Sequence, residues 1–493
     1  MVWAIAVSPL VMVLGMITGL RRPAHWAAVA GTALAAVLIW WLPEFALPGD
    51  VLAEGAGGAG LLVLNAAAVM LPGVYLSQVL TRREVHRSLQ EWVRGLPLPG
   101  PATIALVVAG IAPTVEALTG FGVSLLVTVP VLLALAPAPT ALRQAMLGMN
   151  IMPWGTLGLA TVIGAALTGR ETAAMGTATA VTSSLVFPLV TVWAALLTRP
   201  RRRFRTAVMA AAAGAVLSLG LLAFDRAGVV QPAGVLAGLS TTAVGLVICA
   251  VRRSRAGAGP GAGAGAGSGG RLLPPAAVLR AYGLVLGGIV LTRVAKALGV
   301  PPLELHAGNA SFALLSSPCL PLLAAALVLD RGRPNGPDAR AALTRVGRPL
   351  LALAGFVALG RLMADSGMIG ELGSAVAGSP SPVIALVAPA LGMLSGFLTG
   401  SNVGGNALMM PLQERLAPAG AGLDAWFAAL QNSAAGHAVF TSLPMIMLIL
   451  AVAGDRAKSS GVSEHTLLRF GLRVAAAVYA ALAATALALV SFT

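Results

Sequence analysis

Two stretches of the chain place glycine, threonine and other small polar residues inside strongly apolar sequence. Residues 115–124 read VEALTGFGVS, and residues 397–406 read FLTGSNVGGN. Glycine allows a sharp backbone reversal, and the N–H groups that such a break frees at a helix N-terminus favour an anion. Glycine inside a membrane can also simply permit close helix packing. Because threonine, serine and asparagine accompany these glycines, we expect an anion-binding site.

Glu116 is the sharpest single candidate for chemistry. A charged side chain at the bilayer centre costs roughly 2.5–3.5 kcal/mol, so an acid at that depth is usually buried, paired or protonated. We expect Glu116 to bind and release a proton that is coupled to transport. The alternative is a structural acid that stabilises the turn by hydrogen bonds. His437, five residues after Asn432, could take part in coupling or simply pack. The predicted anion site comprises Thr119, Gly120, Phe121, Gly122, Asn150, Ser401, Asn402, Asn406, Asn432, Ser433 and His437.

The composition indicates a membrane protein. The chain has 493 residues, of which 57% are hydrophobic and 10% are charged, whereas an ordinary globular domain carries about 25% charge. Apolar runs of roughly 20 residues, the length that crosses a bilayer, recur from residues 3–20 to the C-terminal region. Because these runs are continuous rather than alternating, they predict helices and not barrel strands. We expect the first run to be a retained span and not a signal peptide.

The formal net charge of +15 does not indicate a partner nucleic acid. The basic residues lie in short clusters between apolar runs, as they do in cytoplasmic loops under the positive-inside rule. These clusters lie at residues 21–22, 82–94, 199–205, 252–271 and 331–348. The two cysteines, Cys249 and Cys319, give neither a disulfide framework nor a metal signature. We therefore expect no metal and no cofactor.

Placing the basic clusters in the cytoplasm predicts a two-part organisation. Residues 1–197 form a first unit of three spans, an interrupted hairpin at residues 101–137 and two further spans, with the N-terminus outside. Residues 198–251 form two bridging spans. Residues 252–271 form a flexible cytoplasmic linker rich in glycine, alanine and arginine.

Residues 272–493 repeat the order of the first unit upside down, with a hairpin at residues 383–416. Single spans are expected at residues 142–167 and 311–329, among others. The predicted fold is therefore an all-α polytopic membrane protein with about 12 transmembrane helices. Two re-entrant or interrupted hairpins occupy matching positions in an inverted two-fold repeat.

An ordered series of short matches supports the repeat. Leu-Thr-Gly occurs at residues 118–120 and again at residues 398–400, and a proline follows after 10 or 11 residues. Asn150 and Asn432 then lie near the middle of the next span, each followed by a glycine. Inverted repeats with broken helices at matching positions indicate a secondary transporter with its site near the midplane.

These motifs resemble those of the lactate permease family. Family members carry a glutamate, three intervening residues and Gly-Phe-Gly, matched here from Glu116 to Gly122. They also carry an asparagine in the following span, matched by Asn150, and a late Leu-Thr-Gly-Ser run, matched at residues 398–401. The resemblance covers most of the chain. It implies a proton-coupled importer of lactate, glycolate and similar 2-hydroxy monocarboxylates, whose hairpins ride on a moving transport domain.

Two positions depart from the family pattern. Asn402 stands where the family usually has aspartate, and Phe440 stands where it usually has lysine. Losing an acid and a base together keeps the local charge balanced but alters what the site could bind. His437 could supply the missing polar group. Another carboxylate or a sulfonate therefore stays open as the substrate.

The sequence thus predicts a transporter and not an enzyme. We expect symport of a proton with a small organic anion, such as L-lactate or glycolate, across the plasma membrane. The expected partners are that anion, the proton and membrane lipid, and a homodimer is left open. Export or a channel also stay open. An integral membrane enzyme is disfavoured because the five histidines are scattered along the chain.

Overall fold

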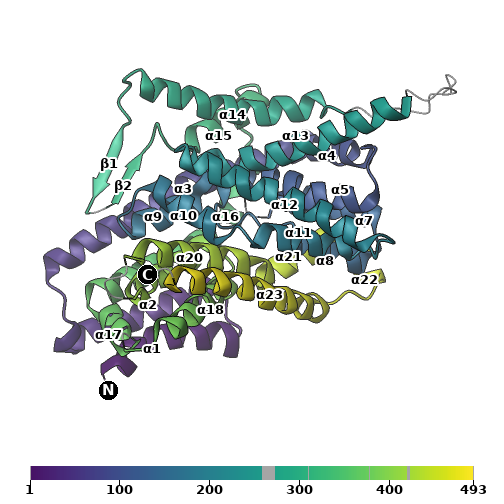
Figure 1. The fold of residues 1–493 in the computed structure, drawn as a ribbon. Coiled ribbons are helices and arrows are strands. Elements are labelled where there is room, and N and C mark those ends of the chain that lie inside the picture. The colour runs from purple at the N-terminus through teal and green to yellow at the C-terminus, as the bar shows by residue number, and fades with distance from the viewer. Residues whose placement is uncertain are drawn as a thin grey trace.

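The structure is a computed structural model that describes residues 2–120, 122–257, 272–308, 310–376, 378–418 and 422–491. Within these residues nearly all regular structure is helical, and most helices run along one common direction (Figure 1). Ten of the described helices are long and apolar enough to cross a membrane, or up to 12 if each of two bent pairs is one span. The predicted fold class, an all-α polytopic membrane protein, is confirmed.

Four helices precede the first hairpin. They are α1 (Val2–Leu14), α2 (Ala24–Trp41), α3 (Gly49–Arg82) and α4 (Val85–Arg94). α1 continues into a π-helical turn (Gly15–Gly19). α4 is amphipathic, because it buries Leu89 and Trp92 while Arg87 and Glu91 form an exposed ion pair. It lies with the short helix α22 (Asp455–Ser459) at one end of the bundle (Figure 1).

The first hairpin lies inside the bundle. Its elements are α5 (Gly100–Leu106), a π-helical turn (Val107–Ile111), α6 (Ala112–Thr119) and α7 (Ser124–Leu135). The apolar window of Gly100–Thr119 is 94% buried, against 22% for α1 and α2. The chain breaks at Gly120, within the stretch predicted to be interrupted. Phe121 lies outside the described residues.

The next predicted span, residues 142–167, is broken in two, so that part of the prediction was wrong. The observed helices are α8 (Ala138–Leu147) and α9 (Leu159–Leu167). Gly155 and Gly158 between them have φ angles of 63° and 73°, which an α-helix does not accommodate. The following pair, α10 (Thr172–Thr182) and α11 (Val186–Leu196), is bent by 45°.

Three long helices fill the middle of the chain. They are α12 (Arg203–Arg226), α13 (Val230–Gly257) and α14 (Ala276–Ala297). The predicted linker at residues 252–271 begins inside α13, and its residues 258–271 lie outside the described residues. The prediction of a span at residues 311–329 was wrong at its start. Strands β1 (Glu304–Ala307) and β2 (Ala310–Ala313) form an antiparallel hairpin before α15 (Cys319–Leu329), and Pro318 immediately precedes that helix.

The remaining helices contain the second hairpin. They are α16 (Gly336–Asp365), α17 (Met368–Val376), α18 (Ser381–Thr399), α19 (Asn402–Leu416), α20 (Asp424–Ala438), α21 (Leu443–Ala453) and α23 (Glu464–Ser491). A 3₁₀ turn (Val439–Thr441) separates α20 from α21, and the pair is bent by 42°. The second hairpin is therefore α18 and α19, with its break at Gly400.

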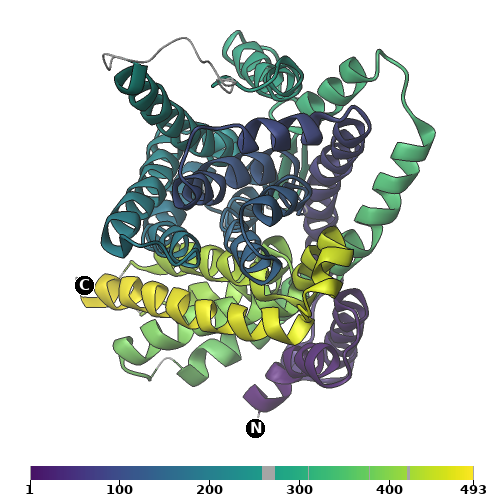
Figure 2. The same cartoon turned by 90° about the vertical axis from the view of Figure 1, so that its right-hand side faces the viewer.

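The types of element recur in the two parts of the chain. A long span, a short helix, a hairpin and a broken helix occur in this order from α3 to α9 and again from α16 to α21. The long spans α3 and α16 pack against each other. The N-terminal helices α1 and α2 pack beside the later part of the chain, against α17 and α16 (Figure 2). The two parts are thus interleaved within one bundle, and one apolar core runs through both.

Candidate functional site

Glu116 lies at the tip of the first hairpin, where it closes the break between α6 and α7. Its side chain is 1% exposed. The carboxylate accepts hydrogen bonds from the backbone N–H of Gly122 at 2.9 Å, the N–H of Ser124 at 3.2 Å and the Ser124 hydroxyl at 2.7 Å. These two N–H groups lie at the start of α7, where a helix has no backbone acceptors of its own. Glu116 therefore occupies the anion-binding position of that helix N-terminus.

Gly120 and Gly122 give the tip its shape. Their φ angles are 70° and 72°, a region that residues with a Cβ rarely adopt. A Cβ on Gly120 would also overlap the side chain of Thr156, in the unwound segment after α8. The Thr119 hydroxyl donates to the Val115 carbonyl at 2.7 Å. The tip of the first hairpin is thus packed tightly against the break between α8 and α9.

The second hairpin breaks in a different way. Gly400 ends α18 in the left-handed conformation, and the Ser401 side chain caps α19 by accepting from the N–H of Gly404 at 3.3 Å. Asn402 begins α19 and is buried. No acid of the second hairpin occupies the position that Glu116 takes in the first, because a serine hydroxyl caps this helix.

Three asparagines form a buried amide cluster. The Asn432 Oδ1 accepts from the Nδ2 of Asn402 at 2.8 Å and from the Nδ2 of Asn406 at 2.7 Å. The Asn432 Nδ2 donates to the carbonyl of Pro153 at 3.1 Å and to the hydroxyl of Thr179 at 3.1 Å. The cluster thus joins α19 and α20 to the unwound segment after α8 and to α10.

Two oxygens of the amide cluster are buried acceptors without a donor among the described residues. Within the described part of the chain, the Oδ1 atoms of Asn402 and Asn406 are buried and have no hydrogen-bond partner. A buried acceptor without a donor costs about 1–3 kcal/mol. The two oxygens would accept from a hydroxyl or a protonated carboxyl group.

Neighbouring hydroxyl groups extend the cluster. The Ser433 hydroxyl lies 2.6 Å from the Thr182 hydroxyl and accepts from the Ser183 hydroxyl at 2.9 Å. The Asn432 amide also donates to Thr161 at 3.3 Å. The threonines and Ser183 were not predicted from the sequence. The one sequence signal for Thr179 and Thr182 is their spacing of three residues on one helix.

Asn150 and His437 lie outside this hydrogen-bonded cluster. The Asn150 Nδ2 donates to the carbonyl of Val108 at 3.3 Å, in the π-helical turn of the first hairpin. The His437 ring packs edge-on against Phe187 at a centroid distance of 5.3 Å. Its Nε2 has no hydrogen-bond partner among the described residues. The predicted site therefore separates into the Glu116 tip, the amide cluster and these two buried side chains.

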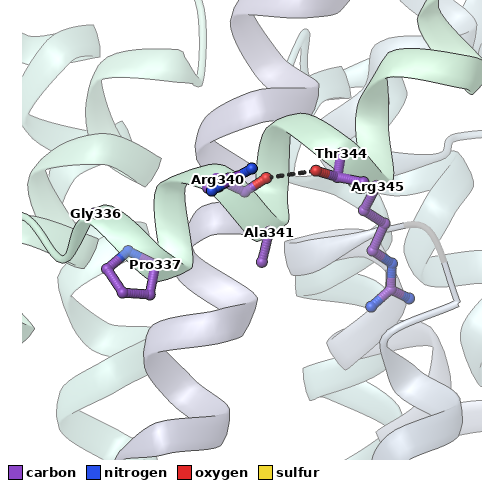
Figure 3. A pocket seen from close by; sticks show the side chains of 6 residues that line it. All are labelled: Gly336, Pro337, Arg340, Ala341, Thr344 and Arg345. Carbon is purple, nitrogen blue, oxygen red and sulfur yellow. Dashed lines mark hydrogen bonds between the residues drawn. The ribbon is translucent and has the colours of Figure 1, made fainter.

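Two hollows lie beside α16, one at each end. The first, near the start of the helix, measures about 840 Å³ and is lined by Gly336, Pro337, Arg340, Ala341, Thr344 and Arg345 (Figure 3). The second measures about 240 Å³ and lies between the end of α16 and the end of α19, with Arg361, Glu414 and Arg415 in its lining. Neither hollow is lined by a residue of the predicted site.

The membrane-length helices and their two buried hairpin tips define an integral, multi-pass membrane protein. Residues 296–491, from the end of α14 through α23, match the sequence model of a family described as L-lactate permease. Over these residues the match agrees with the predicted resemblance to the lactate permease family, and the motifs around Glu116 and Asn150 lie outside the matched residues. Together with the membrane-spanning helices, this match to a permease family favours a role in membrane transport. A search of curated proteins found no match to the chain.

Proposed function

We propose that the protein is a proton-coupled symporter of a small 2-hydroxy monocarboxylate, such as L-lactate or glycolate, in the plasma membrane. The family match supports the substrate class. The observation that carries the coupling is the Glu116 carboxylate, which is buried and bound to both N–H groups at the start of α7. When Glu116 binds a proton it weakens these hydrogen bonds, and when it releases the proton it forms them again.

Proton binding and anion binding are linked at the first tip. A protonated Glu116 is a weaker acceptor than the carboxylate, so it releases the N–H groups of Gly122 and Ser124. Those N–H groups then bind the carboxylate of the substrate, which takes the place of the Glu116 charge at the helix N-terminus. One proton and one monocarboxylate therefore enter together, and the loaded site carries the same charge as the empty one.

The amide cluster is a second recognition point in this proposal, separate from the Glu116 tip. The free Oδ1 atoms of Asn402 and Asn406 are acceptors for the 2-hydroxyl group of lactate or glycolate. A site built to accept from a hydroxyl group discriminates strongly against an analogue that lacks it. Propionate is therefore expected to be a much poorer substrate than L-lactate.

The recurring order of elements supports an inverted repeat, in which the two hairpins open toward opposite sides of the membrane. In this arrangement the N-terminus lies outside and the arginine-rich clusters lie in the cytoplasm. The alternative is a carrier of another carboxylate or sulfonate, or an exporter. This alternative is favoured because Asn402 stands where the family usually has aspartate.

Uptake into proteoliposomes tests the proposal. An inward proton gradient is expected to drive accumulation of labelled L-lactate by the native protein. Glu116→Gln, which keeps the size of the side chain but carries no proton, is expected to abolish accumulation while lactate exchange persists. Glu91→Gln on the exposed face of α4 is the matched control and keeps full accumulation. Undiminished gradient-driven accumulation by Glu116→Gln contradicts the assignment of the proton site.

A further inference from the structure

The hollow at the start of α16, called here the α16 hollow, presents one face of that helix. Its six lining residues form three neighbouring pairs, each pair four positions after the one before, a spacing that brings side chains to one side of a helix. Figure 3 shows these side chains along α16, with Arg345 extending away from the helix axis. The Thr344 hydroxyl donates to the carbonyl of Arg340 at 2.9 Å.

The α16 hollow carries positive charge. Arg340 and Arg345 line it, and the acid nearest to them in the sequence, Asp338, is held by Arg82 of α3 at 2.9 Å. Asp330, at the end of α15, also pairs with Arg82. These two acids are thus already paired within the scaffold of α3, α15 and α16. A hollow lined by cations concentrates anions from water.

The charge of Arg345 also reaches the first hairpin tip. Arg345 is half-buried, and its guanidinium interacts electrostatically with the carboxylate of Glu116. The hollow is open at the protein surface, because Arg340 and Thr344 are exposed, and Arg345 is the most buried of its lining residues.

A second arginine-lined hollow marks the other end of the same helix. Arg361 lines it and lies 21 residues after Arg340, which corresponds to about 30 Å along an α-helix. The hydrocarbon core of a bilayer is also about 30 Å thick. The two hollows thus lie about one membrane thickness apart, and in the second one Arg361 pairs with Asp365 at 3.5 Å. The helix α19 packs against α16 between them.

We propose that the α16 hollow is a vestibule that binds the carboxylate of the transported anion through Arg340 and Arg345, on the side of the arginine-rich loops. This inference rests on the proposed function and extends it to two residues beyond the hairpin tips. In this proposal the anion binds at Arg340 and Arg345 from water, before it reaches the hairpin tips. Arg340 and Arg345 act on substrate binding and take no part in proton transfer.

Thiol labelling tests the vestibule without measuring transport. The variant Thr344→Cys, with the buried free cysteines Cys249 and Cys319 replaced by serine, places one reactive thiol in the hollow. In phosphatidylcholine vesicles, an anionic methanethiosulfonate is expected to react about tenfold faster than a cationic one of similar size. L-lactate is expected to slow the anionic reagent. The double change Arg340→Gln and Arg345→Gln is expected to remove both effects.

Two further variants separate the hollow from general surface charge. Arg203→Gln removes the same charge from an exposed position at the start of α12 and is expected to leave both effects intact, while Arg345→Lys is expected to keep most of the preference. Gel filtration and thermal unfolding establish that each variant is folded. The proposal is overturned if L-lactate gives no protection, or if Arg203→Gln acts as strongly as the double change of Arg340 and Arg345.

The remaining outcomes distinguish this inference from the proposed function. Protection by added phosphatidylglycerol but not by L-lactate would identify a lipid headgroup site and overturn the vestibule. Gradient-driven accumulation without any protection would leave the symporter standing and remove the vestibule. Protection by L-lactate without gradient-driven accumulation would support the vestibule and contradict the proton-coupled symporter.

Discussion

At the scale of single residues, the asparagines and the acid of the predicted site have different surroundings. Glu116 has three donors and makes its contacts within its own hairpin. Asn402, by contrast, donates across 250 residues of sequence to the carbonyl of Met152 at 3.2 Å. The hydrogen bonds of Glu116 are therefore local in the sequence, while the amide side chains connect segments that are distant in the sequence.

His86 on α4 predicts a pH-dependent stability. It is buried, its Nδ1 lies 3.2 Å from the Thr81 hydroxyl, and burial lowers the pKa of His86 to about 4. In the unfolded chain a histidine has a pKa of about 6.5. Above pH 6.5 the residue is neutral in both states. As the pH falls from 6.5 toward 4, the unfolded state takes up the proton first, so stability falls by about 2 kcal/mol at pH 5.

Thermal unfolding in detergent between pH 5 and pH 8 measures this effect. His86→Gln is expected to flatten the decline below pH 6.5, whereas His465→Gln, at an exposed position on α23, is expected to preserve it. An equally steep decline in His86→Gln would show that another group titrates.

At the scale of elements, the first hairpin depends on one contact between its tip and the break in the next helix. Gly120→Ala introduces strain of about 1–2 kcal/mol at a positive φ and a collision with Thr156. We expect this variant to lose L-lactate uptake and to unfold at a lower temperature. Adding Thr156→Ala is expected to relieve most of the collision, since only the Thr156 Cβ then lies close, at 3.0 Å. It does not relieve the strain, so we expect it to restore part of the uptake and part of the stability. Gly100→Ala, where a Cβ meets nothing within 4 Å, is the matched control, and equal damage there would argue against this account.

The sequence was sufficient to predict the elements that local chemistry determines. Glycine marked both hairpin breaks, hydrophobic length marked the spans, and an acid in apolar sequence marked the tip. The break between α8 and α9 was not predicted, because glycine also occurs inside intact helices, as Gly164 does in α9, and so does not by itself specify a break. The partners of Asn432 could not be predicted, since Thr161 and Thr179 lie more than 250 positions away. The reach of Arg345 to Glu116 depends on the same long-range packing.

At the scale of the whole molecule, the amide cluster is a point where the two parts of the chain meet. Asn432→Leu keeps the approximate volume but removes every hydrogen bond of the side chain. It leaves the amides of Asn402 and Asn406 without their shared acceptor. We expect a loss of about 3 kcal/mol in the free energy of unfolding and a loss of L-lactate uptake.

Thr191→Val is the matched control for this change. Thr191 is also buried, but its hydroxyl donates only within its own helix, to the carbonyl of Phe187 at 2.7 Å. Chemical unfolding followed by tryptophan fluorescence is expected to separate the two variants by about 2 kcal/mol. Equal stability of the two variants would show that the cluster does not hold the parts together.

The hydrogen bonds that Glu116 makes at the first hairpin tip also affect how many protons such a carrier would let through without substrate. On the proposed mechanism, the deprotonated empty protein has its tip donors bound to Glu116, and the loaded protein has them bound to substrate. A protein that carried a proton but no anion would leave the N–H groups of Gly122 and Ser124 buried without an acceptor, which costs about 1–3 kcal/mol for each. That half-loaded form would be rare, so the fold itself would suppress futile proton cycling when lactate is scarce.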